Sequence, residues 1–205
     1  MTDPIEIGKL LRAGTAGFVV GCSVAQFDQP RFGALVRVPV TENYEIFGVI
    51  QNIRIDDDGL VRQLVSSAAF VSDEILRDNR ERRIVPVEMS VLSVGYMENG
   101  KIWHMLPPQP ALSLEKIYLC DEKEIALFTS GEGIRYLRHL LRADDAPIPE
   151  LIASHIAQVE KAHSDPQAWV SAATSFLIQQ LRDDHSTLMS VLNALSEIFD
   201  GTDLR

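Results

Sequence analysis

Two β-rich runs that follow each other closely constrain the fold of this chain more than any other feature. Residues 32–40 alternate aliphatic with other side chains, and after a short turn residues 46–55 do the same. Because successive side chains of a strand point to opposite faces, each run predicts a strand with one face in a core. Gly48 interrupts the second run, and a glycine inside a strand marks a bulge or a corner where a sheet curls. The pair therefore indicates a small closed barrel.

Further runs extend the prediction of a barrel. Residues 17–24 are β-branched and bracketed by glycines, which predicts a strand. Residues 84–106 predict a hairpin, because Asn99-Gly100 is the pair preferred where both central turn residues need positive φ. A last strand is expected within 116–120, with a continuation at 125–128. Together these runs predict a barrel of about six strands.

After residue 130 the periodicity changes from two to three or four. Apolar residues recur at helical spacing in residues 134–142, 149–163, 165–182 and 185–199. Asp165-Pro166 is a strong helix start, an N-cap followed by proline at the first helical position. The predicted fold class is therefore α+β, a small closed barrel followed by a helical domain. Its expected parts are the barrel over 1–130, a linking helix and linker over 131–146, and the helical domain over 147–205.

The apolar stripes of the predicted helices allow two interpretations. One is ordinary packing within a small bundle. The other is that part of this surface docks a partner or a second copy, because helices without a sheet to cover rarely bury every stripe. The outside of the barrel is likewise expected to be free for docking.

A dense basic patch on this otherwise acidic chain is the best candidate for a binding site. It lies at the end of a helix expected over 66–83 and consists of Arg77, Arg80, Arg82 and Arg83. Planar guanidinium groups pair well with carboxylates of a neighbouring subunit or with phosphates. The competing interpretation is that interleaved acidic residues neutralise the patch within its own helix. If one surface recognises an anion, we expect it to be this one.

Charge and composition restrict the classes of partner. The formal net charge of −10 argues against direct nucleic-acid binding, which depends on neutralising phosphates with lysine and arginine. Cys22 and Cys120 are the only cysteines and lack metal-ligand spacing. No window approaches the apolar run needed to cross a bilayer, and the N-terminus lacks a basic start followed by an apolar core. We therefore expect a cytoplasmic protein without membrane contact.

Motifs that would indicate an enzyme are weak. Gly8-Lys9 lacks the other residues of a P-loop, and no Gly-x-Ser-x-Gly motif is present. The glycine-rich stretch 14–21 continues into β-branched residues instead of a helix, so it predicts a turn and the start of a strand. Glu160 and His163 share one helix face, but a metal site of the carboxylate-bundle type needs a second such pair. We expect no cofactor, no metal-ligand cluster and no catalytic residue.

Residues 17–21, 32–40 and 45–55 resemble the HAS-barrel, the small barrel shared by HerA-type hexameric ATPases and the N-terminal crown of ATP-synthase catalytic subunits. Pro107-Pro108 falls where such barrels lead into the next domain. The resemblance implies a place in an oligomer, because these barrels sit in rings on ATPase motors and contact neighbours and partner proteins. This chain lacks the P-loop core that follows the barrel in HerA-type ATPases.

The expected function is that of a non-enzymatic assembly or adaptor subunit. The resemblance implies that its protein partner is a HerA-type ring ATPase or another oligomeric complex, and that the chain forms a homo-oligomer. The alternative is an enzyme or small-ligand-binding protein with a site in the barrel mouth or at the barrel–helix junction, on residues that the sequence does not identify. A third hypothesis, a nucleic-acid accessory protein, predicts salt-sensitive binding through Arg80, Arg82 and Arg83.

Overall fold

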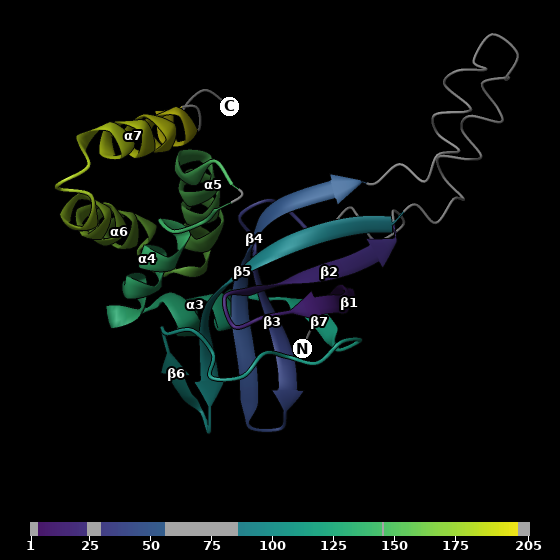
Figure 1. Ribbon diagram of the computed structural model, residues 1–205. Coiled ribbons are helices and arrows are strands. Elements are labelled where there is room, and N and C mark those ends of the chain that lie inside the picture. Colours follow the sequence, from purple (N-terminus) through teal and green to yellow (C-terminus); the bar gives the residue numbers. More distant parts are fainter. Residues whose placement is uncertain (1–3, 24–29, 56–85, 145, 201–205) are drawn as a thin grey trace, which may run out of the picture.

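Six antiparallel strands close into a barrel, and the helices that follow lie against one side of it (Figure 1). The computed structural model describes residues 4–23, 30–55, 86–144 and 146–200. The strands are β1 (Glu6–Ala13), β2 (Gly17–Ser23), β3 (Leu35–Thr41), β4 (Tyr44–Ile55), β5 (Pro86–Glu98), β6 (Lys101–Trp103) and β7 (Lys116–Leu119). The predicted fold class, a closed barrel followed by helices, is confirmed.

Strand pairing runs in a complete circle. β1 pairs with β2, β2 with β5, β5 with β4, β4 with β3, β3 with β7, and β7 with β1, and every pair is antiparallel. The short strand β6 extends the hairpin of β5 outside this circle. Closure pairs the strand edges that an open sheet would leave exposed.

The barrel interior is filled by aliphatic side chains with one aromatic ring. This interior core contains Ile7, Leu10, Phe18, Val20, Val36, Val38, Ile46, Ile50, Met89, Val91 and Ile117, with Ala34 and Ala111. Gly48 lies at a register shift between β4 and β5, so the bulge predicted there is confirmed. A Cβ at Gly48 would lie 2.4 Å from Cγ1 of Val91, which shows how closely the two strands approach at this point.

The hairpin is the local prediction that the structure confirms most directly. β5 and β6 are joined by Asn99 and Gly100, whose φ angles are 50° and 75°. Both central residues of the turn therefore have the positive φ that the Asn-Gly pair predicts. β6 ends at Trp103, so the returning strand is shorter than the sequence suggested.

Strand β1 was not predicted, because its pattern does not follow a period of two. The register shifts between Glu6 and Gly8 against β7, and again between Leu10 and Arg12 against β2. Each bulge moves the following side chains to the other face of the strand. Ile7 lies at the first bulge and therefore shares the interior core with Leu10, although the two are three residues apart.

The predicted strand continuation at 125–128 is wrong, because this segment is helix α3 (Glu122–Thr129). Its start is a capping box. The Asp121 side chain accepts a hydrogen bond from Glu124 N at 2.8 Å, and the Glu124 side chain accepts one from Asp121 N at 2.9 Å. Arg37 on β3 then pairs with Glu124, with 2.6 Å between Nε and Oε1, which ties α3 to the barrel.

The remaining helices follow the predicted periodicity. They are the 3-10 helix η3 (Gly131–Tyr136), α4 (Leu137–Leu140), α5 (Ile148–Val159), the 3-10 helix η4 (Glu160–Ala162), α6 (Pro166–Gln180) and α7 (His185–Asp200). The predicted start at Asp165-Pro166 is confirmed, since the Asp165 side chain accepts a hydrogen bond from Ala168 N at 3.0 Å.

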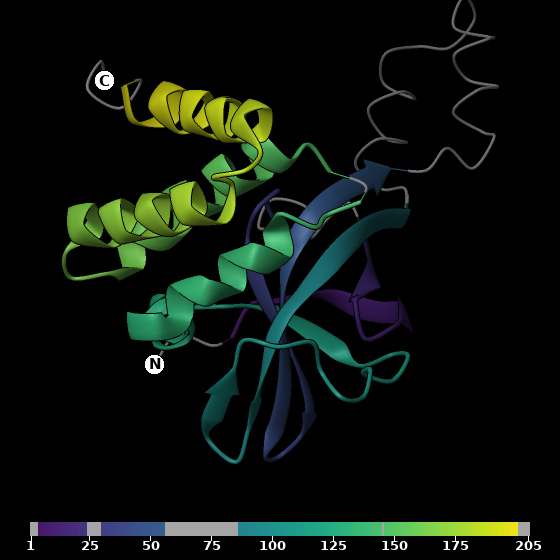
Figure 2. The ribbon, with the colours of Figure 1, turned by 60° about the vertical axis from the view of Figure 1, so that its left-hand side comes forward.

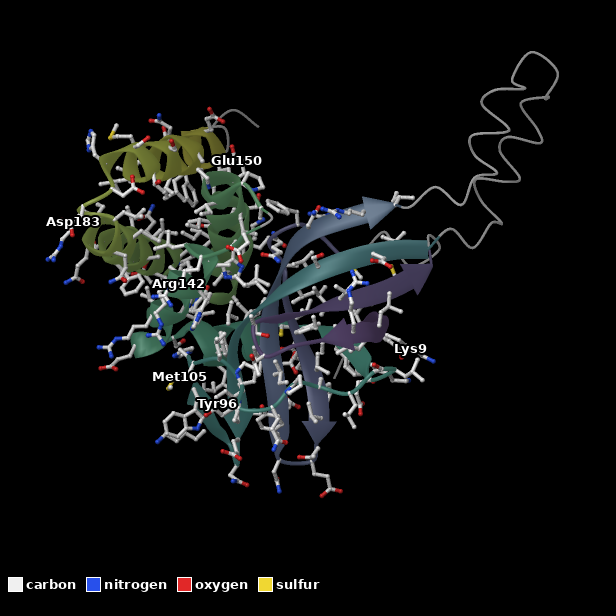
Figure 3. All side chains as sticks on the ribbon, in the orientation of Figure 1. Lys9, Tyr96, Met105, Arg142, Glu150 and Asp183 are labelled. Atoms are coloured by element: carbon white, nitrogen blue, oxygen red, sulfur yellow. The ribbon has the colours of Figure 1, made fainter. Side chains whose placement is uncertain are left out.

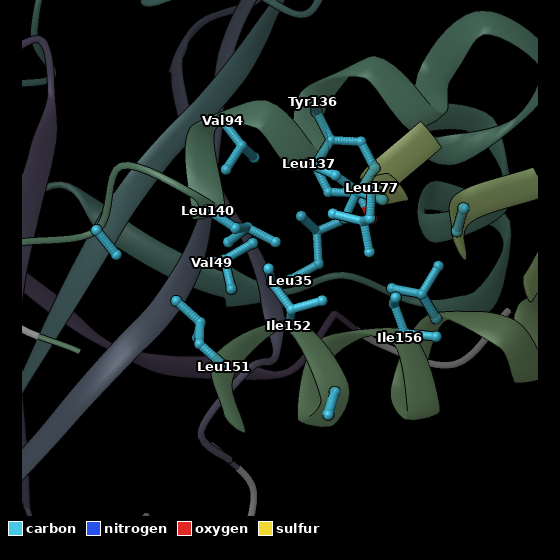
Figure 4. Packing of buried hydrophobic residues seen from close by; sticks show 14 of the residues in the cluster. Leu35, Val49, Val94, Tyr136, Leu137, Leu140, Leu151, Ile152, Ile156 and Leu177 are labelled. Atoms are coloured by element: carbon cyan, nitrogen blue, oxygen red, sulfur yellow. The ribbon is translucent and has the colours of Figure 1, made fainter. Parts of the chain in front are cut away.

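The helices do have a sheet to cover, because they pack on the outer wall of the barrel. A second buried cluster, the junction core, joins Leu35, Phe47, Val49 and Val94 of the strands to residues of every α-helix from α3 to α7. Figure 4 shows Leu35 and Val49 close to Leu140 and Ile152. In Figure 2 the segment from α3 to α4 lies against the barrel, with α6 and α7 farther out. One wall of the barrel is therefore not free for docking, contrary to the expectation from sequence.

Candidate docking surface

The arginines predicted to recognise an anion lie outside the described residues. Arg77, Arg80, Arg82 and Arg83, with the helix expected over 66–83, fall in the gap between β4 and β5. Their prediction therefore stays a prediction.

His155 on α5 is part of a buried latch that holds the helices to the barrel. Its Nδ1 donates a hydrogen bond to the carbonyl oxygen of Gly33 at 2.6 Å, so its Nε2 accepts one from the Tyr136 hydroxyl at 2.5 Å. Both side chains are fully buried. Burial lowers the pKa of His155 to about 4 and raises that of Tyr136. The latch is therefore neutral at physiological pH.

A second polar cluster surrounds the backbone carbonyl of His104. Arg138 and His139 both donate hydrogen bonds to this oxygen, and His104 Nε2 donates one to Phe128 O at 2.9 Å. Burial lowers the pKa of His104 and of His139. These groups connect the end of the β5–β6 hairpin to α3 and α4, so their role is structural.

The metal site considered for Glu160 and His163 finds no support in their contacts. His163 Nε2 lies 2.9 Å from Thr129 Oγ1, and its ring stacks on Trp169 with 4.9 Å between centroids. Thr129 donates its own hydroxyl proton to Ile125 O, so the imidazole is the donor. Within the described ranges no group of three or more histidine, cysteine or acidic side chains is placed to hold a metal.

The two cysteines are poorly suited to nucleophilic chemistry. Burial raises the pKa of Cys22, and that of Cys120 is raised well above its ordinary value. Both thiols are therefore protonated at neutral pH, whereas the thiolate is the reactive form.

Three leucines with exposed side chains, which we call the leucine patch, lie on β1 and on the segment that runs beside it: Leu11, Leu112 and Leu114. Their exposed fractions are 44%, 68% and 73%. Leu114 N donates a hydrogen bond to Leu10 O at 2.7 Å, and the Ser113 hydroxyl donates one to Leu11 O at 3.4 Å. These bonds place the segment that carries Leu112 and Leu114 beside β1.

The segment that carries Leu112 and Leu114 is anchored at several points. Ala111 is buried in the interior core, and the Tyr44 hydroxyl donates a hydrogen bond to Gln109 O at 3.2 Å. Leu114 has a φ of 73°, a left-handed conformation that disfavours a side chain with a Cβ. An exposed leucine is thus held in a strained backbone conformation, and such strain concentrates at functional sites.

The leucine patch lies on the side of the barrel away from α6 and α7. β1 and these helices occupy opposite sides in Figure 1, and Lys9 on β1 and Asp183 after α6 lie at opposite sides in Figure 3. Basic residues flank the patch. Lys9 is exposed, and Lys116 pairs with Glu6 at 2.8 Å, a hydrogen bond that raises the pKa of Lys116.

Sequence reasoning missed the leucine patch because β1 itself was missed. The available signal was Leu112-Ser-Leu114, two leucines in a proline-bearing connection that is not expected to contribute a core. No helix in the described part of the chain combines the length and apolar character required to span a bilayer. No protein-family model matches the chain, and a search of curated proteins found no matching sequence.

Proposed function

We propose that the chain is a non-enzymatic assembly or adaptor subunit in the cytoplasm, partner to a ring-forming ATPase of the HerA kind. The observation that carries the proposal is the leucine patch, three exposed leucines on the barrel wall away from the helices. Exposed apolar side chains on neighbouring segments are a feature of many protein–protein contacts. The resemblance to HAS-barrels supports a partner that is itself built around such barrels.

The proposal includes self-association into a homo-oligomer. A ring presents the same binding site several times around its axis, so a subunit that docks on it meets identical neighbours. The chain's own helices cover one wall of the barrel, so the region around β1 remains as a surface for such contacts. Direct nucleic-acid binding is not part of the proposal, because the net charge of −10 opposes contact with phosphate backbones.

The experiment compares the unaltered chain with a variant carrying Leu112→Glu and Leu114→Glu. Each is measured by light scattering alone, and by size-exclusion chromatography after mixing with the HerA-type ATPase of the same cells. We expect the unaltered chain to form a complex and the variant to lose it, because two carboxylates would be desolvated in the contact.

The matched control is Leu127→Glu on α3, where the side chain is 63% exposed and lies outside the patch. This variant is expected to keep the complex, and circular dichroism checks that all variants are folded. A patch variant that assembles like the unaltered chain contradicts the proposal. So does an unaltered chain that associates neither with itself nor with the ATPase.

A further inference from the structure

A pocket lies where the barrel meets the segment after α4. It has a volume of about 480 Å³, within the range typical of small-molecule sites. The junction pocket, as we name it, is lined by polar side chains that come from four separate parts of the chain: Arg12, Gln51, Arg54, Ser90, Arg142 and Asp144. Figure 3 shows Arg142 near the meeting of helices and barrel.

The charge of the junction pocket is opposite to that of the whole chain. Three guanidinium groups and one carboxylate line it, a formal balance of +2, whereas the chain carries −10. Among the described residues, no carboxylate forms an ion pair with Arg54 or Arg142, and Arg12 has only Glu88 at 3.6 Å. These guanidinium groups therefore keep donors available for a ligand.

A second hollow is also lined by arginines, but these arginines have partners. It lies beside α6 and contains Arg135, Arg138 and Arg182. All three are already engaged: Arg135 pairs with Glu132 at 3.2 Å, Arg182 pairs with Asp183 at 3.2 Å, and Arg138 donates to His104 O. Both hollows therefore contain arginines. In the junction pocket, Arg54 and Arg142 have no ion-pair partner among the described residues, so their guanidinium groups can bind a ligand.

Two further features belong to the walls of the junction pocket. The Gln51 side-chain oxygen is shielded from solvent and has no hydrogen-bond partner within the described part of the chain, and buried polar atoms are normally satisfied. The glycine-rich stretch from Gly14 lines one side as the β1–β2 turn, closed by a hydrogen bond from Gly14 N to Gly17 O at 2.8 Å. A Cβ at Gly17 would lie 2.4 Å from Val91 O, so this turn can only approach β5 with glycine there.

We propose that the junction pocket binds a small phosphate-bearing ligand. The guanidinium groups of Arg54 and Arg142 would hold its phosphate groups through paired hydrogen bonds, a geometry that guanidinium offers and ammonium does not. The inference is independent of the proposed adaptor role, since the leucine patch is not involved.

The test is isothermal titration calorimetry of the full chain with pyrophosphate. We expect binding, with affinity falling about tenfold for each charged contact removed, so that the Arg54→Ala, Arg142→Ala double variant loses about 100-fold. The matched control is Arg182→Ala, an exposed arginine of the second hollow, which is expected to bind like the unaltered chain. Circular dichroism confirms the fold of each variant.

Nuclear magnetic resonance locates the site on the unaltered chain. Pyrophosphate is expected to shift backbone amide signals of the β1–β2 turn and of residues near Gln51, Ser90 and Arg142. Absence of binding at millimolar pyrophosphate overturns the proposal, as does an equal loss of affinity in Arg182→Ala. A preference for citrate over pyrophosphate, or for a single-stranded oligonucleotide, overturns the assignment of a small phosphate-bearing ligand.

Discussion

The interior of the barrel and the junction core are both buried, but they are built from different residues. The interior core is apolar throughout its members, from Ile7 to Ile117. At the junction, Thr129, His139 and His155 are buried among leucine, isoleucine and aromatic side chains. Apolar contacts have little directional preference, whereas each buried hydrogen bond requires one geometry.

The two cores therefore fix the positions of their side chains in different ways. Inside the barrel, strand pairing already fixes the position of each side chain, so volume alone has to be matched. The helices have no backbone ladder to the barrel, and the bonds from His155 to Gly33 and from Gln158 to Phe32 fix their position instead. We therefore expect the interior to respond to changes of volume and the junction also to changes of polarity and pH.

The largest expected effect comes from removing volume at the junction. Ile152→Ala deletes a fully buried side chain and is expected to lower the free energy of unfolding by about 2–5 kcal/mol. The interior counterpart Ile50→Ala is expected to cost a similar amount. Chemical denaturation followed by circular dichroism and tryptophan fluorescence measures both. Because the strands contribute to both cores, one transition is expected, and two separate transitions would show that barrel and helices unfold independently.

The next effect is a loss of stability in acid. The pKa of His155 is about 4 in the folded chain, against about 6.5 when unfolded, so the unfolded chain binds a proton first as the pH falls. The stabilisation is complete above pH ~6.5 and is lost towards pH ~4, a change of about 3 kcal/mol. Denaturation at several pH values measures this slope.

Burial also lowers the pKa of His104, His139 and His163, so these residues change stability in the same direction. The control is His155→Gln, which keeps a neutral donor and acceptor but does not titrate. Its stability should vary less with pH than that of the unaltered chain. If the free energy of unfolding of His155→Gln changed with pH as steeply as that of the unaltered chain, the latch would not be the source of the acid sensitivity.

A smaller effect is expected from Tyr136→Phe. The change keeps the buried ring and removes the hydroxyl that donates to His155, which leaves the imidazole Nε2 without its partner. The expected loss is about 1–3 kcal/mol of the free energy of unfolding. Tyr118→Phe is the matched control on a partly exposed tyrosine and is expected to change stability little. Equal effects of the two variants would mean that the latch contributes nothing specific.

The smallest effect tests the strained leucine. Leu114→Gly is expected to raise the free energy of unfolding by up to about 1 kcal/mol, because glycine adopts positive φ without the penalty of a Cβ. Leu112→Gly lacks this benefit and is expected to be neutral or destabilising. Thermal denaturation measures the stability of the two variants. A destabilised Leu114→Gly would show that the contacts of the leucine side chain stabilise the fold by more than the backbone strain destabilises it.

The sequence predicts those elements whose signal is local. The hairpin at Asn99-Gly100 and the helix start at Asp165 depend on a few adjacent residues, and both are confirmed. The same kind of local signal is present at Asp121 and Glu124, but Ile125 to Phe128 also fits a strand, so the sequence does not decide between the two. β1 could not be predicted from periodicity, since its two bulges depend on partner strands distant in sequence.

The candidate sites show the same limit. The junction pocket brings together Arg12, Arg54 and Arg142, which are separated by long stretches of chain, so no sequence pattern marks them. A run such as Arg80 to Arg83 is conspicuous because it is contiguous. A charged segment is easy to recognise because its residues are adjacent in the sequence. A pocket depends instead on which strands and helices meet in the fold.

The junction core can form only after both the strands and the helices have been synthesised. The barrel strands leave the ribosome before the helices, so Leu35, Phe47 and Val49 emerge without their cover. Val191 and Leu195 of α7, which belong to the same cluster, are synthesised about 140 residues after Val49. Until α7 has been synthesised, the nascent barrel exposes an apolar outer face, and we expect it to depend on chaperones during that interval.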